Sequence, residues 1–220
     1  MLTDPEEDYA RGFVPFLGVN VFLDSRPLIP RTETEWWVEK AIQEMKNLSI
    51  NRKVVRVLDL FAGSGAVGLA VLRHVPRAHV TFGELEPRHF PTIEKSIEEN
   101  RLDRARSTLV ETDVWSSVEG VFDVVLANPP YLSRDRKSAT PSVEQFEPPE
   151  ALFADNDGFA LLEKTIAGLS LHLAEGGIAY LEHEPFHATR LRTVAAQAGL
   201  TATTHDDQYG VARFTTFCRG

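Results

Sequence analysis

The sequence predicts an α/β fold: a doubly wound, mostly parallel seven-stranded sheet with one antiparallel strand, preceded by a β-hairpin. From residue 54 onward, short apolar runs alternate with helical patterns, as in parallel sheets covered by helices on both faces. The last two runs, LTATTH and ARFTTF, are separated by the tight turn DDQYG, which indicates a closing hairpin and hence one antiparallel strand. Of the 220 residues, 43% are hydrophobic, enough for one sizeable core.

Two elements precede the alternating region. The stretch FVPFLGVNVFLDSRPLI (13–29) is typical of a β-hairpin. In the helix that follows, Thr32 and Glu35 have the spacing of a capping box. Four apolar residues then give this helix a buried stripe: Val38, Ala41, Ile42 and Met45. We therefore expect an N-terminal segment with the hairpin in residues 1–34 and the main domain in residues 35–220.

Four apolar runs are predicted to be successive strands: VVRVLDL (54–60), AHVTFGE (78–84), STLVET (107–112) and VFDVVLA (121–127). A helix is expected over 64–75, after the first run. A second helix, over 87–100, has proline in its first turn and carries Phe90, Ile93 and Ile97 on one face.

The second half of the chain continues the alternation after a long interruption. Residues 132–149 contain three prolines and many charges, and an irregular stretch of this length is functional or disordered. The next helix, over 157–173, is expected to stop before the glycine pair at 176–177. The fifth strand is IAYLEH (178–183), and Pro185 opens a last helix that ends near Gly199.

Charge and cysteine content exclude several classes of protein. The net charge of −9 argues against general attraction to nucleic-acid phosphates, and the basic runs at 101–107 and 133–137 fit solvated loops. The single cysteine, Cys218, rules out an internal disulfide and a four-cysteine metal site. No apolar run is long enough to span a membrane and no secretion signal opens the chain, so a cytoplasmic location is the default expectation.

Three acidic residues are expected at the carboxyl ends of successive strands, where doubly wound sheets bind ligands. Asp59 ends the first strand, and Gly63 and Gly65 follow it ahead of a helix, without the Gly-Lys-Ser/Thr of a P-loop. Glu84 ends the second strand, where a carboxylate can bind both hydroxyls of a ribose, and Asp113 after the third can accept from an exocyclic amine. Taken singly, each acid could simply cap the next helix. Together they fit a nucleoside that carries a positive charge and an amino acid, S-adenosyl-L-methionine.

The motif NPPY follows the fourth strand and predicts a site for a planar nitrogen. The Asn128 side-chain oxygen and the Pro129 carbonyl can accept hydrogen bonds from the NH2 of an amide or aromatic amine. Such bonds strengthen as positive charge develops on that nitrogen during methyl transfer. Tyr131 offers a face for the planar substrate group. The competing interpretation is an ordinary proline turn.

The stretch HEPFH (183–187) fits the His-Glu-x-x-His pattern of zinc proteases, in which both histidines lie on one helix. Here Pro185 stands between them and is best placed in the first turn of the next helix. His183 then falls at the strand exit and His187 in the helix. We therefore predict no metal site.

With these residues the chain resembles the HemK/PrmC-type glutamine methyltransferases, class I S-adenosylmethionine-dependent enzymes with a Rossmann-like fold. They methylate the Gly-Gly-Gln tripeptide of peptide-chain release factors. Four stretches carry the resemblance: FLGVNVFLDSRPLIPRTETE, NPPY, FEPPEALFADNDG and YLEH. NPPY alone is shared with adenine-N6 methyltransferases, whereas LIPRTETE and FEPPEAL are far more specific.

The resemblance implies a role for each matching residue. Asn128, Pro129 and Tyr131 would bind the glutamine amide. Glu84 would bind the ribose, Leu85 would flank the adenine, and Asp113 with Val114 would lie at its edge. Thr34 would lie near the methionine carboxylate. The full set expected at the cofactor is Thr34, Asp59, Phe61, Ala62, Gly63, Gly65, Glu84, Leu85, Asp113, Val114 and Asn128.

The sequence also departs from the family pattern. Thr32 replaces a proline, Phe61 and Ala62 stand where Gly-Thr is usual, and Glu84 replaces an aspartate. The helical N-terminal domain that helps these enzymes grip the release factor has no counterpart ahead of the hairpin. The expected partner is a release factor, and two alternatives stay open: an adenine-N6 methyltransferase acting on RNA or DNA, and a non-catalytic cofactor-binding homologue.

Overall fold

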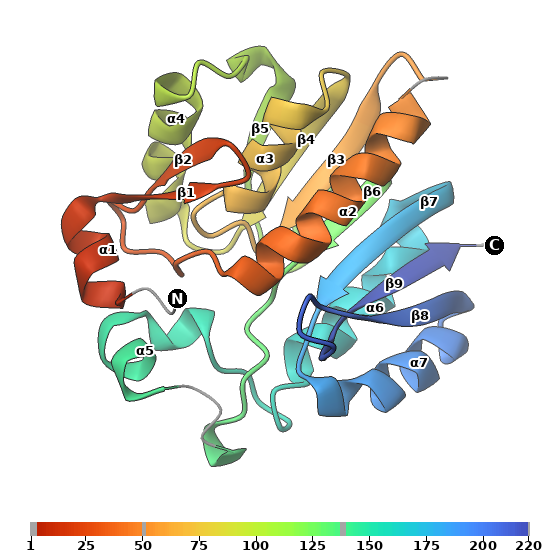
Figure 1. Ribbon diagram of the computed structural model, residues 1–220. Coiled ribbons are helices and arrows are strands. Elements are labelled where there is room, and N and C mark those ends of the chain that lie inside the picture. The colour runs from red at the N-terminus through yellow and green to blue at the C-terminus, as the bar shows by residue number, and fades with distance from the viewer. Residues whose placement is uncertain (1–3, 50–51, 137–139, 220) are drawn as a thin grey trace.

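The computed structural model describes residues 4–49, 52–136 and 140–219, and it confirms the expected fold class (Figure 1). Seven strands form one sheet in the order β5-β4-β3-β6-β7-β9-β8. Strand β9 runs antiparallel to both of its neighbours, and the other pairs are parallel. The strands are β3 (Val55–Leu60), β4 (Ala78–Glu84), β5 (Ser107–Glu111), β6 (Phe122–Ala127), β7 (Leu173–Glu182), β8 (Leu200–Asp206) and β9 (Ala212–Arg219).

Helices cover both faces of this sheet (Figure 1). Neighbouring side chains of a strand point to opposite faces, so Val57 packs in the core below α2, α3 and α4, and Leu58 packs below α6 and α7. The helices are α1 (Pro5–Arg11), α2 (Thr32–Ser49), α3 (Ala66–His74), α4 (Phe90–Glu99), α5 (Pro141–Phe146), α6 (Ala160–His172) and α7 (Ala188–Gln197). Short 3-10 turns are η1 (Pro87–His89), η2 (Arg104–Arg106), η3 (Arg134–Arg136), η4 (Pro149–Ala151) and η5 (Pro185–His187).

The expected hairpin forms a separate two-stranded sheet from β1 (Phe13–Phe16) and β2 (Val19–Phe22). It lies over α3 and α4 (Figure 1), and its buried side chains belong to the same core as those helices. Asn100 fixes it to the end of α4, because its side chain accepts from the Asn20 N–H at 2.8 Å and donates to the Asn20 carbonyl at 2.7 Å. The domain division at residue 34 stays a prediction.

The capping box predicted at the start of α2 is wrong. Glu35 Oε1 accepts the N–H of Leu17 at 3.1 Å, and the Thr32 hydroxyl donates to Glu33. Leu17 lies in the hairpin turn with a φ of 43°. The Glu35 carboxylate therefore stabilises the neighbouring turn rather than the first turn of its own helix.

The glycine pair at 176–177 does not end a helix, contrary to expectation. Helix α6 ends at His172 and β7 begins at once, pairing Leu173 with Phe122. The register then shifts, so the glycines lie in an irregularity inside β7. A Cβ on Gly177 would approach the carbonyl oxygens of Ala174 and Asp123 to 2.9 and 3.0 Å, which explains the need for glycine there.

The stretch expected to be irregular contains the short helix α5, and a further helix, α1, was not predicted. Asp4 caps α1 by accepting from the Glu6 N–H at 3.0 Å, and Gly12 ends it with a φ of 82°. Helices α1 and α5 pack together (Figure 1). No helix in the described part of the chain is long and apolar enough to cross a membrane.

Candidate active site

Polar residues gather where neighbouring strands of the sheet end. Asp59 lies near the end of β3 and Glu84 ends β4, while Asn128 follows β6 and Glu182 ends β7. Strand β3 pairs with β4 on one side and β6 on the other, so the chain order reverses there. The parallel strands therefore bring these side chains to the one edge where doubly wound sheets bind ligands.

Asp59 anchors the turn that follows β3. Its side chain is buried, and Oδ2 accepts the N–H of Gly68 in α3 at 2.8 Å. Burial raises the pKa of Asp59 to about 8, the Glu84 carboxylate adds to the rise, and the Gly68 N–H opposes it. Asp59 thus ties the strand to the helix beneath the glycine-rich turn.

The turn itself adopts a left-handed backbone at three positions. Phe61, Gly63 and Gly65 have φ values of 65°, 51° and 76°. A Cβ on Gly65 would also lie 3.0 Å from Ile93, so helix α4 approaches too closely for a larger residue. The left-handed conformation is strained for a bulky residue such as Phe61, and strain of this kind is concentrated at ligand sites.

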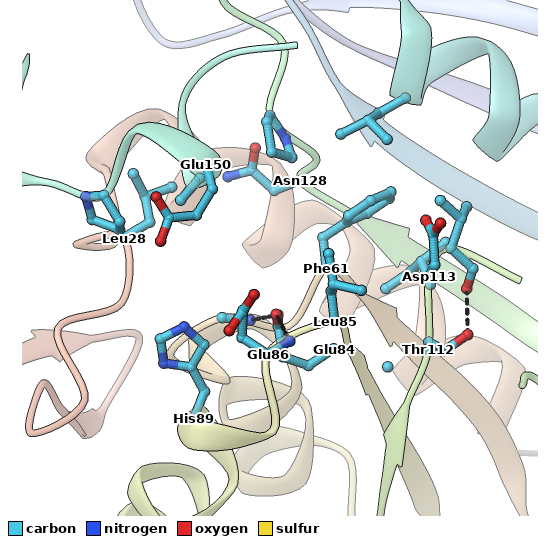
Figure 2. Close-up of a pocket in the computed structure, with 18 of the residues that line it drawn as sticks. Leu28, Phe61, Glu84, Leu85, Glu86, His89, Thr112, Asp113, Asn128 and Glu150 are labelled. Carbon is cyan, nitrogen blue, oxygen red and sulfur yellow. Dashed lines mark hydrogen bonds between the residues drawn. The ribbon is translucent and has the colours of Figure 1, made fainter. Parts of the chain in front are cut away.

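Glu84 bridges this turn to the end of β4. Its Oε2 accepts the Gly63 N–H at 2.7 Å and its Oε1 accepts the Glu86 N–H at 2.9 Å (Figure 2). An ionised carboxylate has about four lone-pair positions. Each oxygen therefore keeps one position for a further donor, and the pair of oxygens can accept the two hydroxyls of a ribose.

A cavity opens above these strand ends (Figure 2). The predicted cofactor residues that line it are Phe61, Gly63, Glu84, Leu85, Asp113, Val114 and Asn128. The lining also includes residues that the sequence did not single out: Leu28, Leu60, Gly83, Glu86, Arg88, His89, Thr112, Pro130, Pro148, Glu150, Ala151 and Leu161. Thr34, Asp59, Ala62 and Gly65 are buried and do not belong to this described lining.

The lining suits a cofactor with a flat base. Leu85 is 56% exposed at the cavity, and Val114 holds a φ of 53°, which is rare for a β-branched residue. Phe61 adds a third apolar side chain (Figure 2). These side chains provide apolar contact for an adenine ring.

The charges of the lining suit a cation. Glu84, Glu86, Asp113 and Glu150 all line the cavity, and Arg88 pairs with Glu150 at 2.8 Å. Carboxylates outnumber the arginine among these lining residues, so the cavity favours a positively charged sulfonium centre over a pyrophosphate.

A second cavity shares Leu28, Asn128 and Ala151 with the first. It is lined by Leu28, Arg31, Asn128, Pro129, Tyr131, Leu132, Thr140, Val143, Ala151, Leu152 and Glu182. All three predicted catalytic residues line this space, and Asn128 lines both cavities. Asn128 therefore stands at the junction between a site suited to the methyl donor and a site suited to an acceptor.

The segment FEPPEALFADNDG holds the exit of the NPPY motif in place. The Leu132 N–H donates to the Leu152 carbonyl at 2.9 Å, and the Ala154 N–H donates to the Leu132 carbonyl at 3.1 Å. Gly158 packs directly against the Tyr131 backbone, since a Cβ there would lie 2.1 Å from the Tyr131 carbonyl oxygen. The NPPY motif and the FEPPEALFADNDG segment, which both carry the family resemblance, are therefore held together by backbone contacts.

An ion pair joins this segment to the LIPR stretch. Arg31 pairs with the buried Glu147, whose Oε2 also accepts the Ile29 N–H at 3.3 Å. Burial raises the pKa of Glu147, and Arg31 opposes the rise. Arg31 also lines the second cavity.

Glu182 is a central polar residue that the sequence analysis did not select. It is buried, and Oε2 accepts from Trp37 Nε1 at 2.6 Å and from the Thr34 hydroxyl at 2.8 Å. Its Oε1 accepts from the Tyr131 hydroxyl at 2.8 Å, and Asn128 Nδ2 lies 3.4 Å from Thr34 Oγ1. Burial raises the pKa of Glu182, and the three donors oppose the rise. The available signal was an acid at the end of the apolar strand YLEH.

His183 follows β7 as expected, whereas His187 ends the 3-10 turn η5 just ahead of α7 rather than lying in the helix. The His183 ring bonds to the Glu184 carbonyl and the Thr215 hydroxyl, both at 2.8 Å, and the His187 ring bonds to the Asp157 carbonyl at 3.0 Å. Burial lowers the pKa of His183 to about 4. No group of three or more metal-ligating side chains occurs within residues 4–49, 52–136 and 140–219.

Comparisons with known proteins identify the fold and the family of this chain. Residues 42–146 match the model of the methyltransferase small domain. Solved structures show the same fold: a ribosomal protein L11 methylase from Lactobacillus delbrueckii is 15% identical with a TM-score of 0.63, covering 93% of this chain and 86% of that chain. A T. thermophilus 16S rRNA methyltransferase, solved with S-adenosylmethionine and guanosine, is 20% identical with a TM-score of 0.61, covering 94% and 49%.

Relatives found by sequence identify the family more narrowly than the solved structures do. Proteins named release factor glutamine methyltransferase match at 33% identity in Deinococcus radiodurans and 31% in Rhodopirellula baltica, over 92% and 86% of this chain. A third, from Streptococcus pneumoniae, is 33% identical over 79%. The matches span 70%, 64% and 60% of the length of these relatives. The chain belongs to the release factor glutamine methyltransferase family, and it is a methyltransferase whose cofactor is S-adenosylmethionine.

Proposed function

We propose that this methyltransferase modifies the side-chain nitrogen of a glutamine in a protein, and that this protein is a peptide-chain release factor with a Gly-Gly-Gln tripeptide. The observation that carries the proposal is the position of Asn128, which lines both the cofactor cavity and the second cavity. An acceptor group held there lies at the junction of the two sites.

The cofactor supplies an electrophilic methyl group. Asn128 and Pro129 act on the acceptor, because the Asn128 Oδ1 and the Pro129 carbonyl can each accept one N–H of a primary amide. These hydrogen bonds orient the nitrogen and strengthen as positive charge develops on it, so they favour the transition state over the ground state. Tyr131 lines the same cavity, where its ring can lie against the planar amide.

We also infer the cofactor contacts from the cavity. Glu84 accepts the ribose hydroxyls, Leu85 and Phe61 contact the adenine, and Asp113 accepts from its exocyclic amine. Asp59 and the backbone of residues 61–65 hold the methionine part. Ala62 and Gly65 shape this turn, and Val114 shapes the adenine pocket.

The glutamine substrate is supported by the relatives, which are named for it, and by the LIPR and FEPPEAL stretches, which the Arg31–Glu147 pair joins at the second cavity. A nucleic-acid adenine is the second candidate, because its N6 amine could use Asn128 in the same way. Charge counts against it: the net charge is −9.

Of the five described arginines in the two basic runs, three bond to other groups of the protein. Arg104 pairs with Glu94 at 3.0 Å, Arg106 donates to the Leu72 carbonyl at 2.8 Å, and Arg136 pairs with Asp157 at 2.6 Å. Lys137 of the second run lies outside the described residues. Three arginines of these runs therefore already have partners within the protein.

The test is a methylation assay with labelled cofactor and two substrates side by side. One is a release factor with its Gly-Gly-Gln loop, with a glutamine-to-alanine form as the matched control, and the other is an adenine-containing oligonucleotide. We expect label on the intact release factor alone. Label on the oligonucleotide but not on glutamine would replace the first proposal by the second.

Asn128 variants test the chemistry on whichever substrate is labelled. Positioning can supply roughly 7–11 kcal/mol of a barrier, so Asn128→Ala should lose about a hundredfold or more in kcat while its cofactor affinity stays close to that of the wild type. Asn128→Asp keeps an acceptor but adds a charge that must be desolvated, so its rate should fall between those of the wild type and Asn128→Ala. Full activity of Asn128→Ala would defeat the mechanism.

A further inference from the structure

The geometry points to a hydrogen-bond relay from Glu182 through Thr34 that fixes which way the Asn128 amide faces. We propose that Glu182 and Thr34 are positioning residues: they hold the Asn128 NH2 toward helix α2 and so present its oxygen to the acceptor nitrogen. This inference rests on the proposed role of Asn128, and it holds for a glutamine or an adenine amine alike.

The direction of each hydrogen bond in the relay follows from the number of protons that Thr34 and Glu182 can donate. A threonine hydroxyl has one proton, and an ionised carboxylate can only accept. Thr34 Oγ1 lies 2.8 Å from Glu182 Oε2, so Thr34 gives its proton to Glu182. Its oxygen can then only accept from Asn128, at the 3.4 Å contact. The amide must therefore direct its nitrogen toward Thr34 and its oxygen away from it.

Two further donors keep Glu182 in its accepting role. The Trp37 indole N–H can only donate, and it bonds to the same Oε2 at 2.6 Å. The Tyr131 hydroxyl bonds to the other oxygen at 2.8 Å. Glu182 is 2% exposed, so water does not compete for these positions. The carboxylate is thereby held between helix α2 and the NPPY motif.

The orientation matters because an amide has two unlike ends. With its amide turned the other way, Asn128 would place its own NH2 against the NH2 of the acceptor. Both groups are donors, so the acceptor would lose one of the two hydrogen bonds that orient it. The relay also accounts for the burial of Thr34 away from the cofactor cavity lining. Its place is behind the catalytic amide rather than beside the methionine carboxylate that the resemblance implied.

The first test compares Thr34→Val, which is close in shape but has no hydroxyl, with Thr34→Ser, which keeps it. We expect Thr34→Val to lower kcat on the order of tenfold with the cofactor KM unchanged, since one net hydrogen bond is worth about that factor. Thr34→Ser should restore most of the rate. Thr165→Val is the matched control, because its buried hydroxyl donates to the Leu161 carbonyl within α6, and it should leave the rate unchanged.

The second test removes the need for orientation. In Asn128→Asp both terminal atoms of the side chain are oxygens, so the relay no longer has an amide orientation to fix. Adding Thr34→Val to Asn128→Asp should then cost about twofold or less, whereas it costs about tenfold in the wild type. A merely structural role of Thr34 predicts the same loss in both backgrounds, and that result would overturn the proposal.

A third measurement needs no substrate. The side-chain NH2 signals of Asn128 in an NMR spectrum are identified by their absence from Asn128→Asp. Their shift and hydrogen exchange should change in Thr34→Val and stay unchanged in Thr34→Ser and Thr165→Val. Unchanged signals in Thr34→Val refute the relay, whatever the activity. A wild type that methylates neither substrate refutes the proposed function instead, so the two failures are told apart.

Discussion

Replacing Glu84 gives the most direct test of the cofactor site. The side chain is 9% exposed, and each oxygen already accepts one backbone N–H, from Gly63 at 2.7 Å and from Glu86 at 2.9 Å. If each oxygen also accepts a ribose hydroxyl, Glu84→Ala removes charge-assisted hydrogen bonds worth about 1.5–3 kcal/mol. At 1.4 kcal/mol per factor of ten, affinity should fall roughly ten- to a hundredfold.

Glu84→Gln should not rescue this loss. An amide in place of the carboxylate puts an NH2 against one of the two backbone N–H groups, donor against donor, so the glycine-rich turn loses one of its anchors. Glu84→Asp keeps both oxygens on a shorter stem and should bind better than either of the other two variants. Glu99→Ala, an exposed glutamate at the end of α4, is the control and should bind like the wild type.

Calorimetry with S-adenosylmethionine and with analogues that lack one ribose hydroxyl measures the effect. Wild type should lose affinity for the deoxy analogues, and Glu84→Ala should not distinguish them from the parent cofactor, because its acceptor is already gone. Unchanged affinity of Glu84→Ala would remove Glu84 from the site. An equal penalty for the deoxy analogues in both proteins would show that Glu84 acts on the turn and not on the ribose.

Three further predictions concern other parts of the site. Burial raises the pKa of Asp59 from an ordinary 3.8 to about 8, so its contribution to stability is full below about pH 4 and is lost as the pH rises toward 8. Between pH 5.5 and pH 8.5, the free energy of unfolding in urea should therefore decline less for Asp59→Asn than for the wild type. Equal declines would contradict the raised pKa. Gly158→Ala should lower kcat at least tenfold, because its Cβ would lie 2.1 Å from the Tyr131 carbonyl oxygen and displace the NPPY backbone; Gly210→Ala also has a positive φ but meets nothing within 4 Å, so it separates backbone strain from displacement. Dialysis against a chelator should leave turnover unchanged, and activity that disappears and returns with zinc would mean that HEPFH binds a metal.

The core of the fold could be read from local patterns because the central strands β3 and β6 are buried at nearly every position. The run at 78–84 became β4 (Ala78–Glu84) with the same bounds, and 121–127 became β6 apart from its first residue. A strand buried on both faces must be apolar at nearly every position, so its limits are visible without knowing its neighbours. Asp59, Glu84 and Asn128 were visible for the same reason, since each stands at or next to the end of such a run.

Contacts between distant segments could not be read in this way. Thr32 and Glu35 have capping-box spacing, but the Glu35 carboxylate bonds to the N–H of Leu17 in the hairpin turn instead. The pair Gly176–Gly177 looks like a helix stop, but it serves an irregularity in β7 that the register against β6 requires. In both cases a local rule competes with a partner far away in the chain, and burial against that partner decides.

By itself, the sequence determined the alternation of strands and helices, the strand ends at which Asp59, Glu84 and Asn128 stand, and a resemblance carried by NPPY and LIPRTETE. Only the tertiary structure decided what surrounds Asn128. Glu182, Thr34 and Trp37 meet there from β7 and α2, 145 residues apart between Trp37 and Glu182. A hydrogen bond has no sequence period, because its partners need only complementary atoms within about 3 Å once the chain has folded.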